Sequence, residues 1–283
     1  MPPKRTASRG SPRSRLKTAA GTGLSTWMLY PVVLLVLLLY LCFYTQYAVH
    51  ISENILYFIH PTADRAFAYG ENHFDDTNPQ AYDINRAEFY FKLADAQNPR
   101  LPYVNHELAR IAFLQGDFTT ALAYINVQIE REGDTTPNSY YVRGLIEGFM
   151  GDYLDAERDY AHFLTFDPFD WAGINDYVWV LLKDKKPREA DAQIAAVLPY
   201  AQNNPWLLNS DAIALFELGD TRTARSRIAQ AAQAVSSLDS TQWSHAYPGN
   251  DPSVAPAGLA AFKAAVSANM HSIDSGSLKD TVQ

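Results

Sequence analysis

The sequence predicts an all-α protein in which an N-terminal transmembrane helix is followed by an α-solenoid of helix pairs and a C-terminal capping helix. Two observations support this. Small residues in the middle of the chain recur every 34–35 positions, and a 23-residue run near the N-terminus carries no charged side chain. A fixed period of that length is typical of stacked helix pairs. An uncharged run of that length is enough to cross a bilayer.

Composition limits the class of partner. The chain has 283 residues, 47% of them hydrophobic and 19% charged, so most of it can build a core. Six of the 23 basic residues lie in the first 17 positions, which hold no acid. The rest of the chain therefore has 17 basic and 31 acidic residues, a formal charge of −14. Nucleic-acid binding needs a basic face, so we expect no nucleic-acid partner.

The N-terminal region predicts a membrane anchor. Residues 1–25 are basic and rich in Ser, Pro, Gly and Thr, which predicts a disordered cytoplasmic tail. Trp27–Val49 has no charge, and as a helix it would extend about 34 Å. Aromatic residues near its ends would lie at the two membrane interfaces. We therefore expect a signal anchor over residues 26–50.

Two other interpretations of this run are less favoured. A cleaved signal peptide has a shorter apolar region of roughly 7–15 residues and a small-residue exit, and Thr45–Ala48 offers no clean site. A lipoprotein signal needs small residues before its cysteine, whereas Tyr40 and Leu41 precede Cys42, the single cysteine of the chain. The basic flank predicts a single-pass protein of the plasma membrane, with its N-terminus in the cytoplasm and its repeats on the outer or periplasmic side.

Residues 51–82 are expected to form juxtamembrane helices and a loop. Ile51–Ile59 would continue the helix out of the membrane, and Thr62–Phe74 would form a second helix capped by Thr62 or Asp64. Asp75–Gln80 is a loop. The solenoid is expected over residues 83–238, and its first element, Asp83–Gln97, has the pattern of the second helix of a pair.

Four regular units follow, at Pro102–Glu132, Pro137–Asp167, Trp171–Asn203 and Pro205–Leu238. Each has a small residue early in its second helix, at Ala121, Ala156, Ala190 and Ala224. Each has a turn residue five positions earlier, at Gly116, Gly151, Lys185 and Gly219. A larger apolar residue follows at Ile125, Tyr160, Ile194 and Ile228. Small side chains let two helices approach closely, and the larger ones fill the space around them.

This pattern resembles the tetratricopeptide repeat family over roughly residues 83–236. In that family's frame, the small residue of the first helix falls at Ala109, Gly144, Val178 and Ala212, and the closing proline at Pro99 and Pro168. There are departures, because Val178 is not small, Asp184-Lys185-Lys186-Pro187 replaces the usual Gly-Asp, and Gln128 stands at a small or apolar position. The resemblance is specific as to fold and weak as to function.

The C-terminal region, residues 239–271, is expected to be a loop and a capping helix. The loop contains Trp243, Tyr247 and the sequence Pro-Gly-Asn-Asp-Pro at 248–252, which predicts a turn that folds back on the solenoid. Ala257–His271 would cap the exposed apolar stripe of the last pair. Residues 272–283 are polar and predict a flexible tail.

The sequence contains few features of a catalytic site. The motifs of hydrolases, nucleotide-binding loops and zinc proteases do not occur, and His106-Glu107 is followed by Arg110 where a protease would need a second histidine. We expect no enzyme activity, no catalytic residue, no cofactor and no metal. A hydrolase that uses the 243–252 loop, with His245 and Asp251, is the weakest alternative.

Binding is the better candidate. The resemblance implies that the first helix of each pair lines the concave face, where a partner segment would dock. In that frame the candidate partner-binding residues are Tyr103, His106, Arg110, Tyr141, Leu145, Asn175, Trp179, Asn209 and Ile213, with Phe113 and Phe149 beside them. Aromatics at helical spacing are also common in cores. One cation among them argues against an anionic peptide.

The sequence therefore predicts a membrane-anchored repeat scaffold that binds a protein or peptide partner on the non-cytoplasmic side. An alternative is a structural protein of the envelope whose solenoid forms homo-oligomers and carries no cargo. Sedimentation of residues 50–283 at several concentrations would separate the two.

Overall fold

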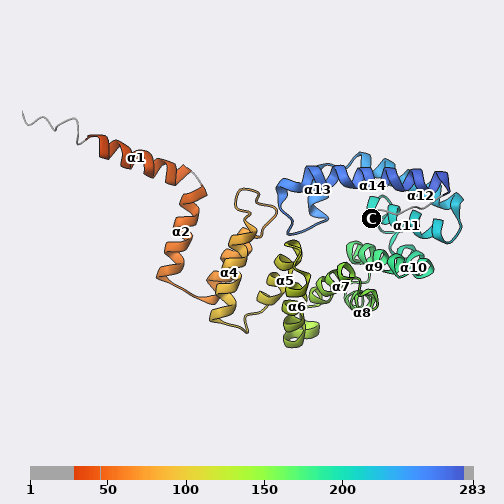
Figure 1. The fold of residues 1–283 in the computed structure, drawn as a ribbon, viewed down its shortest axis with the longest axis horizontal. Helices are drawn as coiled ribbons and strands as arrows, with labels where there is room; N and C mark the ends of the chain where they lie inside the picture. Colours follow the sequence, from red (N-terminus) through yellow and green to blue (C-terminus); the bar gives the residue numbers. More distant parts are fainter. Residues whose placement is uncertain (1–28, 45, 277–283) are drawn as a thin grey trace, which may run out of the picture. The chain divides into compact units, whose positions relative to one another are not determined.

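The structure, a computed structural model, describes residues 29–44 and 46–276, and the regular elements in this part of the chain are helices (Figure 1). The chain divides into two units, residues 1–51 and 52–283, which are described separately below. The tail predicted over residues 1–25 lies outside the described residues, as do Trp27 and the last seven residues of the predicted C-terminal tail.

The N-terminal unit contains α1 (Leu29–Tyr44), a helix of 16 residues. Its large apolar side chains from Tyr30 to Leu41 are 47–74% exposed. Among the described residues, no helix combines the length and the apolar character that a membrane crossing requires. The run Trp27–Val49, expected to form one transmembrane helix, is covered by α1 and by the start of α2 (Gln46–Ile59), while positions 27, 28 and 45 lie outside the described residues.

The second unit is a stack of antiparallel helix pairs, as the sequence predicts. The pairs are α3 (Ala63–His73) with α4 (Ile84–Gln97), α5 (Val104–Leu114) with α6 (Phe118–Glu132), α7 (Asn138–Met150) with α8 (Tyr153–Phe163), α9 (Trp171–Lys183) with α10 (Pro187–Val197), and α11 (Pro205–Glu217) with α12 (Thr221–Ser236). The first helices also contact one another, α5 with α7, α7 with α9 and α9 with α11. They therefore form the inner side of the stack (Figure 1).

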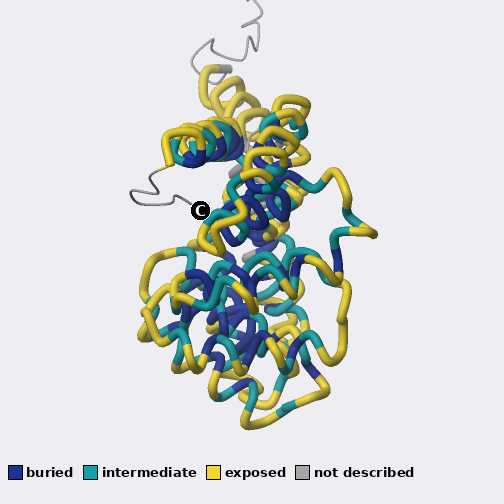
Figure 2. Tube along the Cα trace, turned by 90° about the vertical axis from the view of Figure 1, so that its right-hand side faces the viewer, coloured by how far each residue is buried: buried dark blue, intermediate teal, exposed yellow. Residues whose placement is uncertain are grey.

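The small residues of the repeat lie where two helices meet. Ala121, Ala156, Ala190 and Ala224 are all completely buried, as are Ala109, Val178 and Ala212. A Cβ atom added at Gly144 in α7 would lie 3.1 Å from the Tyr160 ring and 3.3 Å from the Ala156 carbonyl oxygen in α8. The buried positions run through the middle of the pairs, while the exposed ones lie outside (Figure 2). The predicted repeat register is confirmed.

The turns inside the pairs share one backbone conformation. Gly116, Gly151 and Gly219 have φ angles of +79°, +90° and +88°. Lys185, at the equivalent position of the third regular unit, adopts φ +60°. This left-handed region favours glycine, because a side chain there is strained. The lysine therefore takes the backbone shape of the turn even though its residue type departs from the pattern.

The other departure lies in α6. Gln128 is 1% exposed, and its Nε2 atom has no hydrogen-bond partner among the described residues. A buried amide without a partner costs free energy, so this position weakens the pair that contains it.

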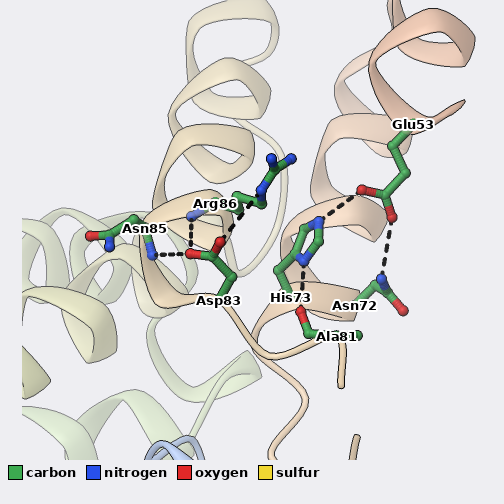
Figure 3. Close-up of polar contacts among 7 residues, drawn as sticks. All are labelled: Glu53, Asn72, His73, Ala81, Asp83, Asn85 and Arg86. Carbon is green, nitrogen blue, oxygen red and sulfur yellow. Dashed lines mark hydrogen bonds and ion pairs between the residues drawn. The ribbon is translucent and has the colours of Figure 1, made fainter. Parts of the chain in front are cut away.

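The first pair is held by polar contacts of a buried histidine (Figure 3). His73 Nε2 lies 2.8 Å from Oε2 of Glu53 in α2, and its Nδ1 lies 2.8 Å from the Ala81 carbonyl oxygen. A carbonyl can only accept, so Nδ1 carries the hydrogen. Asn72 donates to Glu53 Oε1 at 3.3 Å. These bonds fasten the long α3–α4 loop, which ends where Asp83 caps α4 by accepting from the Asn85 and Arg86 backbone N–H groups.

The C-terminal end is closed by helices. α13 (Ser240–His245) and a short 3-10 turn, η3 (Pro252–Val254), lead to α14 (Ala255–Ser275). Val266 and Ile273 of α14 share a buried cluster with Leu208 of α11 and Ile228 of α12. α14 therefore covers the apolar side of the last pair, as expected of a capping helix.

The register generates a stability prediction. Ala156→Arg should lower the free energy of unfolding by about 2–4 kcal/mol, because a charged side chain cannot fit where α7 and α8 meet. Ala161→Arg, at an exposed position of the same helix, is the matched control and should change it little. Urea denaturation of both variants measures this. Equal midpoints for the two would show that the register is wrong.

Candidate functional site

Polar side chains link the inner helices to one another. Three of these contacts join one inner helix to the next, and the fourth joins α11 to the capping helix α14. The pairs are His106 Nδ1 with Ser139 Oγ at 3.1 Å, Tyr141 O–H to Asp176 at 2.6 Å, Ser210 O–H to Asn175 at 2.9 Å, and Asn269 Nδ2 to Asn209 at 3.0 Å. We call this series the polar ladder. Five of the predicted partner-binding residues belong to it or lie beside it in the interior.

These five are not free surface groups. His106, Asn209 and Ile213 are 6%, 3% and 1% exposed. Burial lowers the pKa of His106 to about 3, with the nearby Arg110 acting in the same direction, so the ring is neutral. The Tyr141 hydroxyl donates to Asp176, and the Asn175 side chain donates to Asp176 and accepts from Ser210. Their direct contact with a partner remains a prediction, and their position in the structure is between helices.

Asp176 is the carboxyl group of the polar ladder, and its pKa is perturbed. Burial raises its pKa to about 6, although hydrogen bonds from Tyr141 and Asn175 act in the opposite direction. Burial also raises the pKa of the Tyr141 phenol well above its ordinary value, and Asp176 adds to that effect. The Tyr141 phenol therefore stays neutral, whereas Asp176 keeps its proton to a higher pH than an exposed aspartate does.

The remaining predicted residues lie nearer the surface. Tyr103, which caps α5 with φ +64°, is 39% exposed. Leu145 packs beside Tyr160 and Val180. The Trp179 ring centre is 5.1 Å from that of Phe149, whose ring is in turn 5.2 Å from Phe113. These aromatic rings therefore form a row across neighbouring inner helices.

The inner face is not open, because a C-terminal segment lies on it. We call residues Ala246–Asp251 the strap. Its Tyr247 hydroxyl accepts a hydrogen bond from Trp206 Nε1 of α11 at 2.9 Å, and the Tyr247 ring centre is 4.6 Å from that of Trp243. The strap therefore starts beside the last pair.

The other end of the strap, at Pro248 and Gly249, is bound by residues of the first two helix pairs. Arg110 of α5 donates from Nη2 to the Pro248 carbonyl at 3.1 Å, and the Tyr82 hydroxyl donates to the Gly249 carbonyl at 2.7 Å. The Gly249 N–H donates to Asp76 Oδ2 at 2.8 Å. The residues joined are 138–173 positions apart in the sequence. The predicted turn therefore does fold back on the solenoid, and it joins the two ends of the stack.

Arg110 is the predicted partner-binding residue that hydrogen-bonds to the strap. Its guanidinium donates to Glu107 at 2.7 Å and lies 4.7 Å from the centre of the Phe74 ring. Burial raises the pKa of Glu107, and Arg110 opposes that rise. Burial, with Glu107 nearby, raises the pKa of Glu71 to about 7, again against Arg110. Arg110 is thus positioned by a carboxylate and a ring so that it can reach the strap.

A hollow of about 380 Å³ borders this contact. It is lined by Glu71, Asn72, Phe74, Asp75, Asp76, Arg110, Pro248 and Gly249. Asp75 and Asp76 give its wall an acidic character, to which Glu71 adds only in part because its pKa is raised to about 7. Across residues 29–44 and 46–276, no three His, Cys, Asp or Glu side chains are grouped as metal ligands. His245 is exposed at the end of α13, and Asp251 accepts from the Ser253 N–H to cap η3.

The sequence did not point to Phe74, Asp76 or Tyr82. They lie on the first pair and its long loop, outside the frame of the regular repeats. The Tyr-Pro-Gly sequence of the strap did mark an ordered turn, but nothing in it names the residues that would receive it.

Solved structures similar to this chain support the fold. No protein-family model matches the sequence, and no curated protein matches it. A tetratricopeptide repeat protein from Parabacteroides merdae superposes with a TM-score of 0.54 at 13% identity, covering 79% of this chain and 90% of that one. The fold is of the tetratricopeptide repeat type. The APC/C hetero-tetramer Cut9-Hcn1 is also similar, with a TM-score of 0.53 at 15% identity, covering 80% of this chain and 46% of that one.

The ladder generates a pH prediction. A carboxyl whose pKa rises from 3.8 to about 6 on folding holds its proton more tightly when folded, so stability falls as pH rises through that window. Asp176→Asn removes this loss. The free energy of unfolding of the variant minus that of wild type should therefore be about 2 kcal/mol larger at pH 7 than at pH 4. Chemical denaturation at the two pH values measures it, and a constant difference would contradict the burial of this carboxyl.

Proposed function

We propose that this protein is an interaction scaffold that holds a segment of a partner protein against its inner helices. The observation that carries the proposal is the strap. The first pairs hold it through main-chain atoms, two carbonyls and one N–H, much as a binding protein holds a peptide. The face that carries the strap can therefore bind an extended segment.

The construction of the inner face supports this role. The polar ladder fixes the spacing between neighbouring inner helices, and the buried small residues fix the spacing within each pair. A face preorganised in this way loses little freedom when a partner binds. Tyr103, Arg110 and Trp179 are at least partly exposed, and we assign direct contact to them. Tyr141, Leu145 and Asn175 are also partly exposed, but their side chains pack or hydrogen-bond between helices. The buried candidates position the helices.

Site-specific photocrosslinking in the native cell tests the proposal. A photoreactive amino acid at position 103 or 179 should give a crosslinked product of defined mass, whose partner is identified by mass spectrometry. Position 195, an exposed alanine on the outer helix α10, is the control and should not give that product. A product common to all three positions, or no product from 103 and 179, would argue against binding on the inner face.

We further propose that residues 26–50 attach the scaffold to the plasma membrane, with the repeats on the outer or periplasmic side. Support comes from the uncharged run Trp27–Val49, from the basic residues that precede it, and from the exposed apolar side chains of α1. Apolar side chains that face water are stabilised by transfer into lipid.

Fractionation and labelling test this attachment. Wild-type protein should stay in the membrane fraction after alkaline extraction, and a Leu37→Asp, Leu38→Asp double variant should be released. In a Cys42→Ser chain, cysteine at position 161 should react with an impermeant maleimide in intact cells. Reaction only after lysis would place the repeats on the other side, and release of the wild type would refute the attachment.

A further inference from the structure

The residues that hold the strap recognise its main chain rather than its side chains. All three hydrogen bonds from the first pairs go to strap main-chain atoms, and none needs a strap side chain. Tyr82, Asp76 and Arg110 come from two different helix pairs and the long loop between α3 and α4. The site would therefore make the same bonds to any chain that presents the same backbone shape.

That shape is restricted at the centre of the site, where a side chain would strain the backbone and press on Arg110 and Phe74. Gly249 has φ +89°, in the region that favours glycine. A Cβ atom there would lie 2.6 Å from Arg110 Nη2 and 3.1 Å from Phe74 Cζ. Pro248 precedes it and restricts the turn further. A Pro-Gly turn meets both conditions.

The charge around the site does not suit the strap that occupies it. Glu71, Asp75 and Asp76 line the hollow beside Pro248 and Gly249. The strap continues into Asp251, two residues after Gly249. Burial raises the pKa of Tyr82 to about 12, and the nearby Asp251 and Asp76 act in the same direction. Like charges disfavour each other, so a ligand with a basic residue in place of Asp251 would fit the acidic wall better than the strap does.

We propose that the cleft formed by Phe74, Asp76, Tyr82 and Arg110 is a binding site for a Pro-Gly turn in a partner protein, with a basic residue two positions after the glycine, and that the strap is its built-in competitor. This rests on the proposed scaffold function and names the partner chemistry for one end of the inner face. A partner turn displaces the strap from Arg110 and opens the stack at that end.

The experiment supplies the turn as a separate molecule. A fluorescent peptide of residues 245–252, His-Ala-Tyr-Pro-Gly-Asn-Asp-Pro, is titrated by anisotropy into full-length wild type and into Gly249→Val, in which the valine expels the strap. The opened variant should bind the peptide at least about tenfold more tightly than wild type, because the strap no longer competes. If Gly249→Val is unfolded by circular dichroism, Gly249→Ala replaces it, because its methyl group meets the same atoms.

Three comparisons identify the site. A peptide with Gly249→Val should lose binding, and adding Tyr82→Phe and Arg110→Met to the opened chain should weaken binding by about tenfold or more. A peptide with Asp251→Lys should bind several-fold more tightly than the original at low salt, and the gain should shrink at high salt. Gln115→Ala, an exposed change on the same side of the chain's first repeats, is the control.

Failure of the peptide to bind the opened chain, or binding that ignores Gly249, Tyr82 and Arg110, overturns the proposal. Equal affinity of the Asp251 and lysine peptides overturns its basic-residue part. These outcomes are separate from the scaffold function, because crosslinking from positions 103 and 179 can still capture a partner when the Pro-Gly site is wrong.

Discussion

The structure depends on the close approach of the two helices in each pair. That approach is possible because one side of the contact carries a small residue, as at Gly144 in α7 and Ala156 in α8, where an extra methyl would meet the Tyr160 ring. The large side chain then fills the space that the small ones leave, and it is completely buried. One pair cannot cover both of its faces in this way, so each needs the next.

Stacking creates the second level of organisation, in which inner helices meet one another. Apolar contacts alone would tolerate sliding, whereas hydrogen bonds such as those from Tyr141 to Asp176 and from Ser210 to Asn175 require one alignment. The cost is a buried carboxyl whose pKa is raised to about 6. The same bonds that align the helices remove polar groups from the set that a partner could use.

The strap adds a contact of a different kind, because it joins pairs at opposite ends of the stack. Trp206 holds it at one end, and Tyr82 and Arg110 hold it at the other. A solenoid has only neighbour contacts, so its two ends are otherwise independent. A segment that bridges them would couple the proposed binding at the first pair to the curvature of the whole stack. For a scaffold, such coupling links occupancy of the inner face to its shape.

The sequence by itself determined the helix pairs, their register and their turns, because these features are local and repeat every 34–35 residues. Even Lys185 was placed in its turn by spacing alone. Tertiary structure decided which residues of the inner helices are exposed to a partner and which are covered. The repeat frame gives the direction of Asn209 and Ile213, but α14 and the neighbouring pair cover them. It also decided the strap, because bonds to main-chain atoms across 138–173 residues leave no pattern of residue types to read.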